Sequence, residues 1–499
     1  MSSTETQTDA PTQTEPGSGR LRGNLGPLAI VFMVVAAAAP LTILVSSPTN
    51  MINGNGAGLP VVYFFVPLLL LLFAPGFAAM TRYVPKAGAF YSYVTAGLGR
   101  KVGVGAGFVA MTGYLVFQSF VFTLMGLSIN ETIVGFFGPD AFQLPWFVWP
   151  IAMIVVVAIL GVTNIDVNAK VLSFVLIAEV LVIIIMNIAV LVQGGTPTEG
   201  ISITEQFTPE VLFSGSIAIS LLFGFSIGLG FEATAIFRDE ARDPEKTIPR
   251  AIYIAILSAS VFYFFALWGF IQGWGTQGVM ELLTSDETAQ FWIVYETAAT
   301  YVGPIFMQIM QIVALTSMFA CVLAYHNIAA RYLHSMGHSV LPERLSFVHP
   351  RSGAPYVASL TTSAIALIVI VLWLLSGIDP YVFFGWEIAL GSLALMMVFV
   401  LTSIAIFVYF RKNPANRKNV WVSTISPLLS FLVFGGIMVN AMVNFSALSG
   451  AVDNPVLNTV LMILPVVFFL VGVVAATITQ KRSPERYAGL DHTQANTVV

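Results

Sequence analysis

Two acidic residues lie inside segments that are otherwise apolar. Glu179 and Glu232 each stand in a run of residues long enough to cross a bilayer. A charged side chain at the bilayer centre costs roughly 2.5–3.5 kcal/mol on insertion scales, so each acid needs a partner, a proton or a function. Glu232 is a candidate for binding an amine or carrying a proton, with a structural hydrogen bond as the alternative. Glu179 is a candidate protonatable acid or cation ligand, or else a polar contact that lines a cavity.

Two of the apolar segments are interrupted near their middle. Pro40 follows four alanines in the first segment and removes a backbone donor. Three glycines lie between Phe223 and Glu232 in the other. Unwound turns leave amides that suit a carboxylate and carbonyls that suit an ammonium group. The substrate-binding residues predicted at the two breaks are Ala38, Ala39, Pro40, Thr42, Phe223, Gly224, Phe225, Ser226 and Gly228.

Each interruption also has an ordinary explanation. Pro40 alone could be a simple kink, and Gly224 and Gly228 have the spacing of a close helix-packing face. However, the two breaks are five segments apart, and an acid follows the second. Interrupted helices at matching positions of two halves indicate a transporter built as an inverted repeat, with its site at the midplane of the membrane.

Other polar residues in apolar segments are weaker candidates for a functional role. Glu387 is either an outer gate or simply lies in headgroup water. Thr316 and Ser317 could offer hydroxyl groups to a sodium ion, but such hydroxyls more often bond to carbonyls of their own helix. Cys321 is the one cysteine of the chain, so it is interpreted as a packed residue and cannot form an intramolecular disulfide.

The histidines and two residues of the third segment complete the candidates. His326 is interpreted as a packed hydrogen-bonding residue rather than a proton relay. His334 and His338 have the spacing of metal ligands, but they fall in a predicted loop motif, and no metal site is expected there. Tyr114 and Gln118 could line the wall of a cavity.

The composition decides which elements hold these residues. Of 499 residues, 57% are hydrophobic and 9% are charged, whereas a soluble protein carries roughly 25% charge. Apolar runs of about 20 residues recur along the chain and are too long and even for barrel strands. We therefore predict an all-helical polytopic membrane protein. The twelve predicted spans are 27–47, 58–80, 103–129, 145–163, 170–193, 211–237, 249–272, 302–330, 355–376, 380–410, 421–448 and 456–479.

The basic residues give these spans a direction. All 21 lysines and arginines fall in the tails and in alternate loops, on one side of the predicted spans. Acids such as Asp140, Glu199 and Asp286 occupy the opposite loops. Because cytoplasmic loops carry an excess of Lys and Arg, both tails are predicted to be cytoplasmic.

The predicted organisation has one membrane domain between two tails. Residues 1–24 lack apolar periodicity and are expected to be a disordered tail. The permease domain covers 25–480, with repeat one at about 27–193, repeat two at about 211–410 and two extra helices at about 421–479. Residues 481–499 form a second polar tail.

Three motifs resemble the amino acid, polyamine and organocation permeases (the APC superfamily), in the order expected for that family. The stretch 238–252, which reads RDEARDPEKTIPRAI, is preceded by Gly230-Phe231-Glu232. The stretch PKAGAFYSY at 85–93 comes before the third span, and RYLHSMG at 331–337 comes after the eighth. The resemblance covers about 450 residues. Within the superfamily, the chain is similar in type to bacterial amino acid permeases.

The resemblance implies a five-plus-five inverted repeat with broken first and sixth helices, plus two C-terminal helices. It places Glu232 beside the substrate cavity. It also places Glu179 where some proton-coupled relatives have a lysine that stands in for a sodium ion. One departure concerns the first break, where relatives commonly have a Gly-Ser-Gly type sequence and this chain has alanines and Pro40. Such a break also suits a substrate without an α-carboxylate, such as an amine.

The predicted function is therefore secondary active transport of an amino acid or related amine across the cytoplasmic membrane, by alternating access. Proton- or sodium-coupled symport is expected, with an exchanger or a polyamine importer as alternatives. An intramembrane enzyme and ATP drive are disfavoured because the chain has no His-Glu-x-x-His, Gly-x-Ser-x-Gly or Gly-x-x-x-x-Gly-Lys motif. No cofactor other than the coupling ion and no nucleic-acid partner are expected, and the sequence leaves monomer and homodimer open.

Overall fold

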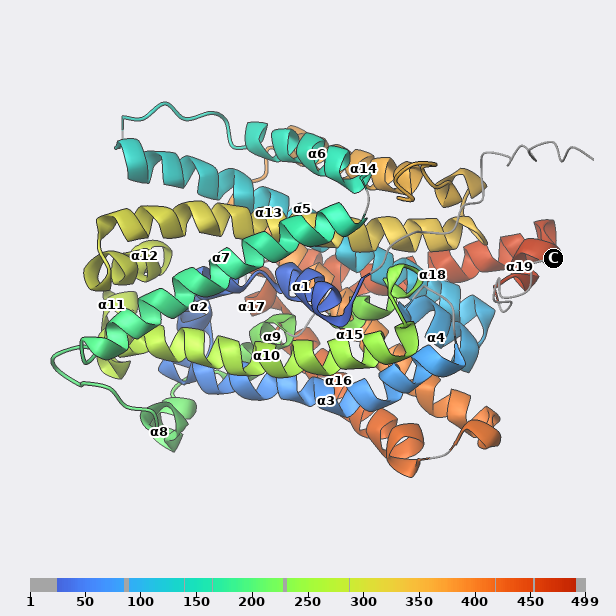
Figure 1. Cartoon of the computed structure of the whole chain (residues 1–499), viewed down its shortest axis with the longest axis horizontal. Helices are drawn as coiled ribbons and strands as arrows, with labels where there is room; N and C mark the ends of the chain where they lie inside the picture. Colours follow the sequence, from blue (N-terminus) through green and yellow to red (C-terminus); the bar gives the residue numbers. More distant parts are fainter. Residues whose placement is uncertain are drawn as a thin grey trace, which may run out of the picture.

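The computed structural model describes residues 25–84, 89–138, 140–163, 165–227, 231–286, 288–417, 419–451 and 454–490. Over these residues the chain is helical, and ten helical segments are long and apolar enough to cross a membrane (Figure 1). They consist of α1 (Pro27–Ala38) with α2 (Pro40–Asn53), α3 (Leu59–Tyr83), α5 (Arg100–Phe137), α7 (Ile165–Val192), α10 (Pro244–Gln272), α13 (Pro304–Gly337), α14 (Tyr356–Ser376), α15 (Pro380–Lys412), α16 (Ser426–Val443) and α18 (Pro455–Arg482).

The remaining two predicted spans are present in a shorter form. The fourth is α6 (Val148–Gly161), which has only 14 residues where 145–163 was predicted. The sixth is not one helix over 211–237. It contains α8 (Pro209–Leu212), α9 (Ile217–Ile227) and η3 (Phe231–Ala235). Residues 228–230, which hold the last two glycines, lie outside the described residues.

Short helices lie at both ends of the bundle. Helices α8, α11 (Thr276–Ser285) and α12 (Ala289–Tyr301) occupy one end, and α4 (Ala89–Leu98) and α19 (Pro484–Ala488) lie at the opposite end (Figure 1). The latter is the end that carries the basic loops. The other short elements are η1 (Gly56–Gly58), η2 (Glu205–Phe207), η4 (Arg238–Glu240), η5 (Glu343–Ser346), η6 (Pro414–Asn416), the π-turn η7 (Trp421–Ile425) and α17 (Phe445–Ser449).

The segment after residue 481 begins with structure rather than as a plain polar tail. The Arg486 side chain in α19 donates to the carbonyl oxygens of Gly337 and Leu341, at 2.8 Å each. Leu490 is buried. These contacts dock the start of the C-terminal segment on the loop that follows α13.

Helices of the two halves pack against their equivalents. The second span α3 packs on the seventh, α10, and the third span α5 packs on the eighth, α13. The fourth and ninth spans, α6 and α14, are also in contact, as are α2 of the first span and α9 of the sixth. Each pair joins helices five spans apart, which is the arrangement expected when two repeats meet around a two-fold axis.

A buried ion pair joins three of the elements at the basic end. Arg331 of α13 donates from Nε and Nη2 to the two carboxylate oxygens of Glu240, at 2.7 Å each. Both side chains are almost fully buried. The backbone of Leu25 pairs with the same segment, since its N–H donates to the Glu240 carbonyl at 3.0 Å and its carbonyl accepts from Arg242 at 2.9 Å. The start of the first span, the segment after the sixth and the eighth span are therefore tied together.

This ion pair predicts a large and specific loss of stability. Arg331→Ala is expected to destabilise the protein by about 3–5 kcal/mol, because it leaves a buried carboxylate without its partner. Lys246→Ala is the matched control, since the Lys246–Asp243 pair is largely exposed and should change the stability by less than ~1 kcal/mol. Thermal unfolding in detergent measures both effects.

A second comparison separates the charge from the packing. The double variant Glu240→Leu with Arg331→Met should be more stable than Arg331→Ala, because an apolar pair leaves no unpaired charge. Equal destabilisation by Lys246→Ala and Arg331→Ala would contradict the structural importance of the buried pair.

Candidate functional site

The first span is broken at Ala39. This residue has φ 46° and ψ 74°, a left-handed conformation that costs a non-glycine residue roughly 1–2 kcal/mol. Pro40 then occupies the first position of α2, where the amide hydrogen that proline lacks would be unpaired in any helix. The two half-helices α1 and α2 meet at the residues that the sequence indicated.

Glu179 of α7 accepts a hydrogen bond from the N-terminal end of α2. Its Oε2 accepts a hydrogen bond from the backbone N–H of Leu41 at 3.2 Å. The carboxyl group therefore satisfies one of the amides left unpaired at the start of α2, where the helix dipole also favours negative charge. Its side chain is fully buried. Glu179 thus holds the break in place from a different helix.

Two hydroxyl groups extend this contact to the eighth span. Ser317 of α13 donates to Glu179 Oε2 at 2.7 Å, and its oxygen lies 3.1 Å from the Thr42 hydroxyl. Because the Ser317 hydrogen is used on the carboxylate, Thr42 is the donor in that second bond. Thr316 differs, since its hydroxyl donates to the Val313 carbonyl of its own helix at 2.8 Å. Of the two hydroxyls considered for a cation, only Ser317 faces the break.

The second oxygen of Glu179 is available for chemistry. Oε1 is buried and has no hydrogen-bond partner within the described part of the chain. A buried polar atom without a partner is costly, so a ligand or a proton is expected there. A proton, an ammonium group or a metal cation would each satisfy this oxygen. The geometry therefore favours a cation or a hydrogen-bond donor as the ligand.

Aromatic packing anchors both sides of the second break. Phe225 in α9 and Phe231 in η3 lie 5.5 and 5.8 Å from Phe399 of α15, measured between ring centroids. Phe225 is buried among aromatic rings. Phe223 is partly buried and packs against both hydrophobic cores of the bundle. The structure therefore surrounds these two predicted binding residues with packed side chains.

Gly224 lies where two helices approach closely. A Cβ atom at this position would come within 3.1 Å of the Val66 side chain of α3. This contact fits the close-packing alternative for Gly224. The side chains of Ala38, Ser226 and Glu232 and the whole of Gly228 lie outside the described residues. The roles predicted for them remain predictions.

Glu387 is a buried acid, so the suggestion that it lies in headgroup water is wrong. Only 5% of its surface is exposed. The Thr123 hydroxyl of α5 lies 3.4 Å from its Oε2 and is positioned to donate. The residue stands between the third and tenth spans. The alternative role of an outer gate stays a prediction.

His326 joins the third, eighth and ninth spans. Its ring nitrogens lie 3.2 Å from the Gln118 amide nitrogen and 2.8 Å from the Ser359 hydroxyl. Gly161, the last residue of α6, leaves space for these hydrogen-bonded side chains, because a Cβ atom there would collide with both His326 and Ser359. The packed role interpreted for His326 agrees with these contacts.

The remaining candidates are also packed in the bundle. Tyr114 is fully buried and stacks on Tyr332, with ring centroids 5.9 Å apart. The His334 and His338 rings are 5.0 Å apart. Among the described residues, no group of three or more His, Cys, Asp or Glu side chains has the arrangement of a metal site.

Three polar contacts in the structure were not among the predictions from the sequence. Glu240 and Arg331 belong to separate sequence motifs, and nothing in either motif names the other residue as its partner. The amide of Leu41 carries no side-chain signal at all. Glu199, an acid in a predicted outer loop, accepts a hydrogen bond from the Thr276 amide at 2.6 Å and so caps α11.

Comparison with solved structures supports the architecture. The fold is similar to that of a Na⁺-coupled sialic acid symporter in its substrate-bound, outward-open state, with a TM-score of 0.55 and 14% sequence identity. The match covers 84% of this chain and 90% of the symporter chain. The predicted all-helical, polytopic membrane fold is therefore confirmed. Within the described residues, the first span is interrupted at Ala39.

Comparison with characterised and uncharacterised relatives gives the same class. The low-affinity putrescine importer PlaP of Escherichia coli (strain K12) is 23% identical over 70% of this chain and 75% of its own length. The branched-chain amino acid permease BcaP of Bacillus subtilis is 24% identical over 80% of this chain and 83% of its own. An uncharacterised transporter of Mycobacterium tuberculosis (strain H37Rv) is 26% identical over 79% and 82%.

Family membership follows from the whole chain rather than from one motif. Residues 29–488 match the family described as amino acid permease, and this range includes both breaks, Glu179 and the Glu240–Arg331 pair. The chain is therefore a multi-pass membrane transporter rather than an enzyme, and it belongs to the amino acid permease family.

Proposed function

We propose that this protein is a secondary active transporter that imports an amino acid or related amine across the cytoplasmic membrane, coupled to an ion gradient. The observation that carries the proposal is the contact of Glu179 with the break in the first span. One buried carboxyl group joins α7, α2 and α13, and its Oε1 has no hydrogen-bond partner among the residues that the structure describes. A change in its protonation alters the contacts of all three elements together.

The coupling ion we propose is a proton. An alkali cation needs several oxygen ligands, but an N–H and an O–H group already donate to Glu179 Oε2. Donor hydrogens facing the same carboxylate oppose a metal ion, whereas a proton needs only the free oxygen. The deprotonated carboxylate would hold the start of α2 tightly, and the neutral form would hold it less tightly. Proton release and binding then favour different positions of the first span.

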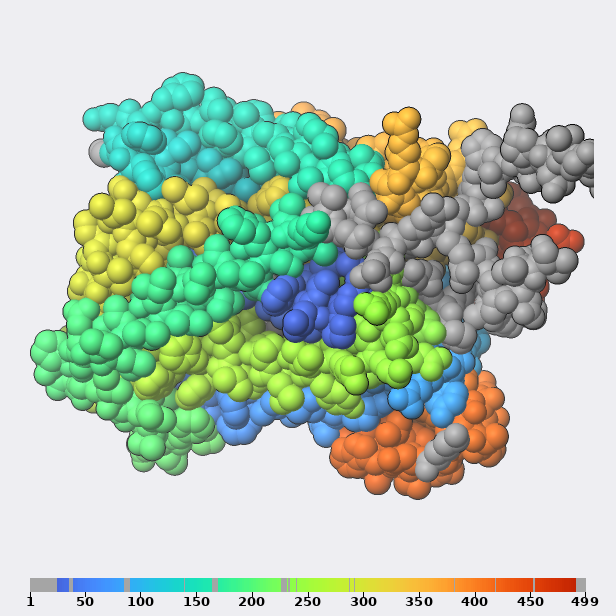
Figure 2. All heavy atoms as spheres, viewed as in Figure 1, coloured from blue at the N-terminus to red at the C-terminus, as the bar shows by residue number. Residues whose placement is uncertain are grey.

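Alternating access also requires the basic end to open. The Glu240–Arg331 pair and the backbone pairing of Leu25 close that end. Helix α1 lies at the molecular surface between α7 and α10 (Figure 2). We propose that α1 moves outward between these helices when the Leu25 contacts separate, which exposes the break from the basic side.

The occupied amide at the break bears on the substrate. Leu41 already donates to Glu179, so this amide is not free to bind a substrate carboxylate, and a second negative charge beside Glu179 would be repelled. An ammonium group suits the same place. This supports an amine, of which the putrescine imported by the Escherichia coli relative is one example, as the second candidate substrate beside an amino acid.

The proposal includes an orientation and a division of the chain. Since all 21 lysines and arginines belong to one side of the predicted spans, we place that side and both termini in the cytoplasm. We assign repeat one to about 27–193, repeat two to about 211–410, and the two extra helices to about 421–479. The tails are 1–24 and 481–499.

Uptake into proteoliposomes tests the function. With an inward proton gradient, a radiolabelled amino acid or diamine should accumulate above its equilibrium level and saturate, because a carrier has a finite number of sites. A preloaded internal substrate that is required for entry would indicate exchange instead. Entry that neither saturates nor responds to any ion gradient would sink the carrier proposal.

Replacing Glu179 tests the coupling. Glu179→Gln keeps a carbonyl oxygen for the Leu41 amide but cannot ionise, so substrate exchange should persist while accumulation driven by a proton gradient falls at least about tenfold. Ser317→Ala should weaken accumulation in part. Thr316→Ala, whose hydroxyl bonds only its own helix, should behave like the wild type. Unchanged dependence on the proton gradient in Glu179→Gln would assign the residue a purely structural role.

Glu232 provides a separate test of the second break. We expect Glu232→Gln to lower uptake by about tenfold or more while the amount of folded protein, judged by size-exclusion chromatography, stays the same. The reason is that the acid following the break is proposed to contact the substrate or its proton. Wild-type uptake by this variant would remove Glu232 from the mechanism.

A further inference from the structure

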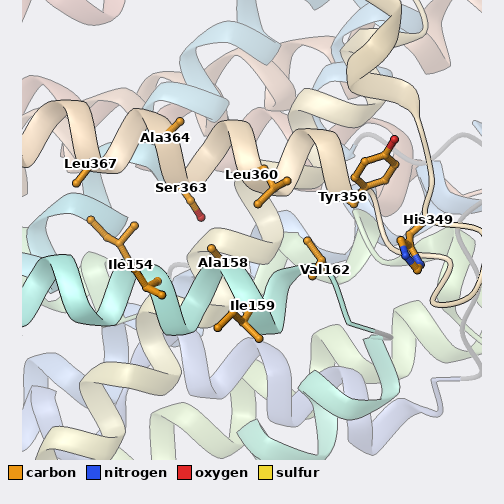
Figure 3. Close-up of a pocket in the computed structure, with 11 residues that line it drawn as sticks. Ile154, Ala158, Ile159, Val162, His349, Tyr356, Leu360, Ser363, Ala364 and Leu367 are labelled. Carbon is orange, nitrogen blue, oxygen red and sulfur yellow. The ribbon is translucent and has the colours of Figure 1, made fainter.

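An apolar groove runs along the outside of the bundle between α6 and α14, the fourth and ninth spans (Figure 3). Its volume is about 480 Å³, within the ~300–1,000 Å³ range of small-molecule sites. The bordering side chains of Val155, Ile159 and Leu360 are 55%, 61% and 49% exposed. On a membrane-spanning face such a groove meets hydrocarbon rather than water, so its natural occupant is a lipid chain.

The short fourth span strengthens this inference. Helix α6 has 14 residues, which corresponds to roughly 21 Å at ~1.5 Å per residue. The hydrocarbon core is about 30 Å thick. A span shorter than the core must be accommodated by the surrounding lipid, and the groove lies along this helix.

One end of the groove is lined by polar side chains, and this lining favours binding of a phosphate group. Ser352 ties the turn before α14 to the end of α6, since its hydroxyl donates to the Val162 carbonyl at 2.9 Å. Its amide donates to His349 Nδ1 at 3.2 Å, which leaves Nε2 of the neutral ring as the donor. The His349 and Tyr356 rings lie together, with centroids 6.0 Å apart, and the exposed Arg351 belongs to the same turn.

The start of α14 also favours a negative charge at this end of the groove. Tyr356 is the first residue of a 21-residue helix, so the positive end of the helix dipole faces the same region. The end lies on the side of the basic loops. An anionic headgroup, rather than a neutral one, fits a cation and several donors gathered at one leaflet.

A buried hydroxyl deeper in the groove gives an independent indication of a ligand. Ser363 is 7% exposed, its Oγ has no hydrogen-bond partner within the described residues, and it points into the groove (Figure 3). Its neighbours Thr361 and Thr362 bond to carbonyls of their own helix. Seven residues beyond Tyr356, Ser363 lies about 10 Å deeper. An ester carbonyl of a glycerolipid would satisfy this hydroxyl.

We propose that the groove binds one anionic phospholipid from the leaflet on the side of the basic loops. The phosphate contacts His349, Tyr356 and Arg351, and an acyl ester accepts from Ser363. The acyl chain lies between α6 and α14, over the small side chains of Ala158 and Ala364. The lipid thereby fills the space beside the short fourth span and stabilises its packing against the ninth.

Native mass spectrometry of the full chain tests the proposal with phosphatidylglycerol and phosphatidylcholine of identical acyl chains. The wild type should retain one phosphatidylglycerol molecule in preference to phosphatidylcholine and gain more thermal stability from it. Ala158→Trp, which fills the groove, should abolish that preference. Arg351→Gln should lower the affinity for phosphatidylglycerol about fivefold, the effect expected for one basic residue near an anionic headgroup.

Val474→Trp on α18 is the matched control, because Val474 is 56% exposed on another helix and its replacement should leave the preference unchanged. Equal retention of the two lipids by the wild type would mean annular lipid only and would overturn the proposal. A preference that survives in Ala158→Trp would place the lipid elsewhere. A dimer that Ala158→Trp converts to monomer would show that a second copy covers the groove, which also contradicts a lipid occupant.

Discussion

The hydrogen-bonding requirement of the backbone in lipid governs this structure. A membrane interior offers no water to unpaired amides or carbonyls, so a helix can be interrupted only where another group takes their place. At the first break that group is the carboxyl of Glu179, which accepts from the Leu41 amide and from Ser317. A side chain that would be costly alone is therefore what makes the unwound turn possible, and the unwound turn in turn gives the carboxyl a reason to be buried.

The two breaks are held by different kinds of interaction. The first depends on a polar contact that a single proton can alter. The second lies between aromatic residues that pack on Phe399 from both sides, and such packing has little dependence on protonation. Under the proton coupling that we propose, the first span would respond to the ion, while packing on α15, the tenth span, supports the residues on both sides of the second break.

Charge is used sparingly and at defined depths. At the basic end, a bidentate ion pair holds three segments that are far apart in the chain. A buried pair of this kind contributes less to net stability than to specificity, because its desolvation cost offsets much of its attraction. The loss of stability becomes large when only one of the two partners is removed, because the other charge then stays buried without a partner. Such a pair suits a contact that must be specific and yet able to separate. An apolar contact of the same area would have no charges to rearrange.

The sequence by itself determined the class of protein, the helical character of its spans and the position of the break in the first span. These features depend on local composition, because apolar length sets a span and Pro40 marks where the first span is interrupted. The limits of α6 and of the sixth span were less predictable, because apolar residues continue past the point where the helix ends. Only the tertiary structure decided which groups meet. Glu179 and Leu41, Glu240 and Arg331, and the walls of the groove between α6 and α14 are brought together by the packing of distant helices. A contact made by a backbone amide or by a surface hollow has no residue pattern of its own, so no reading of one segment at a time could reveal it.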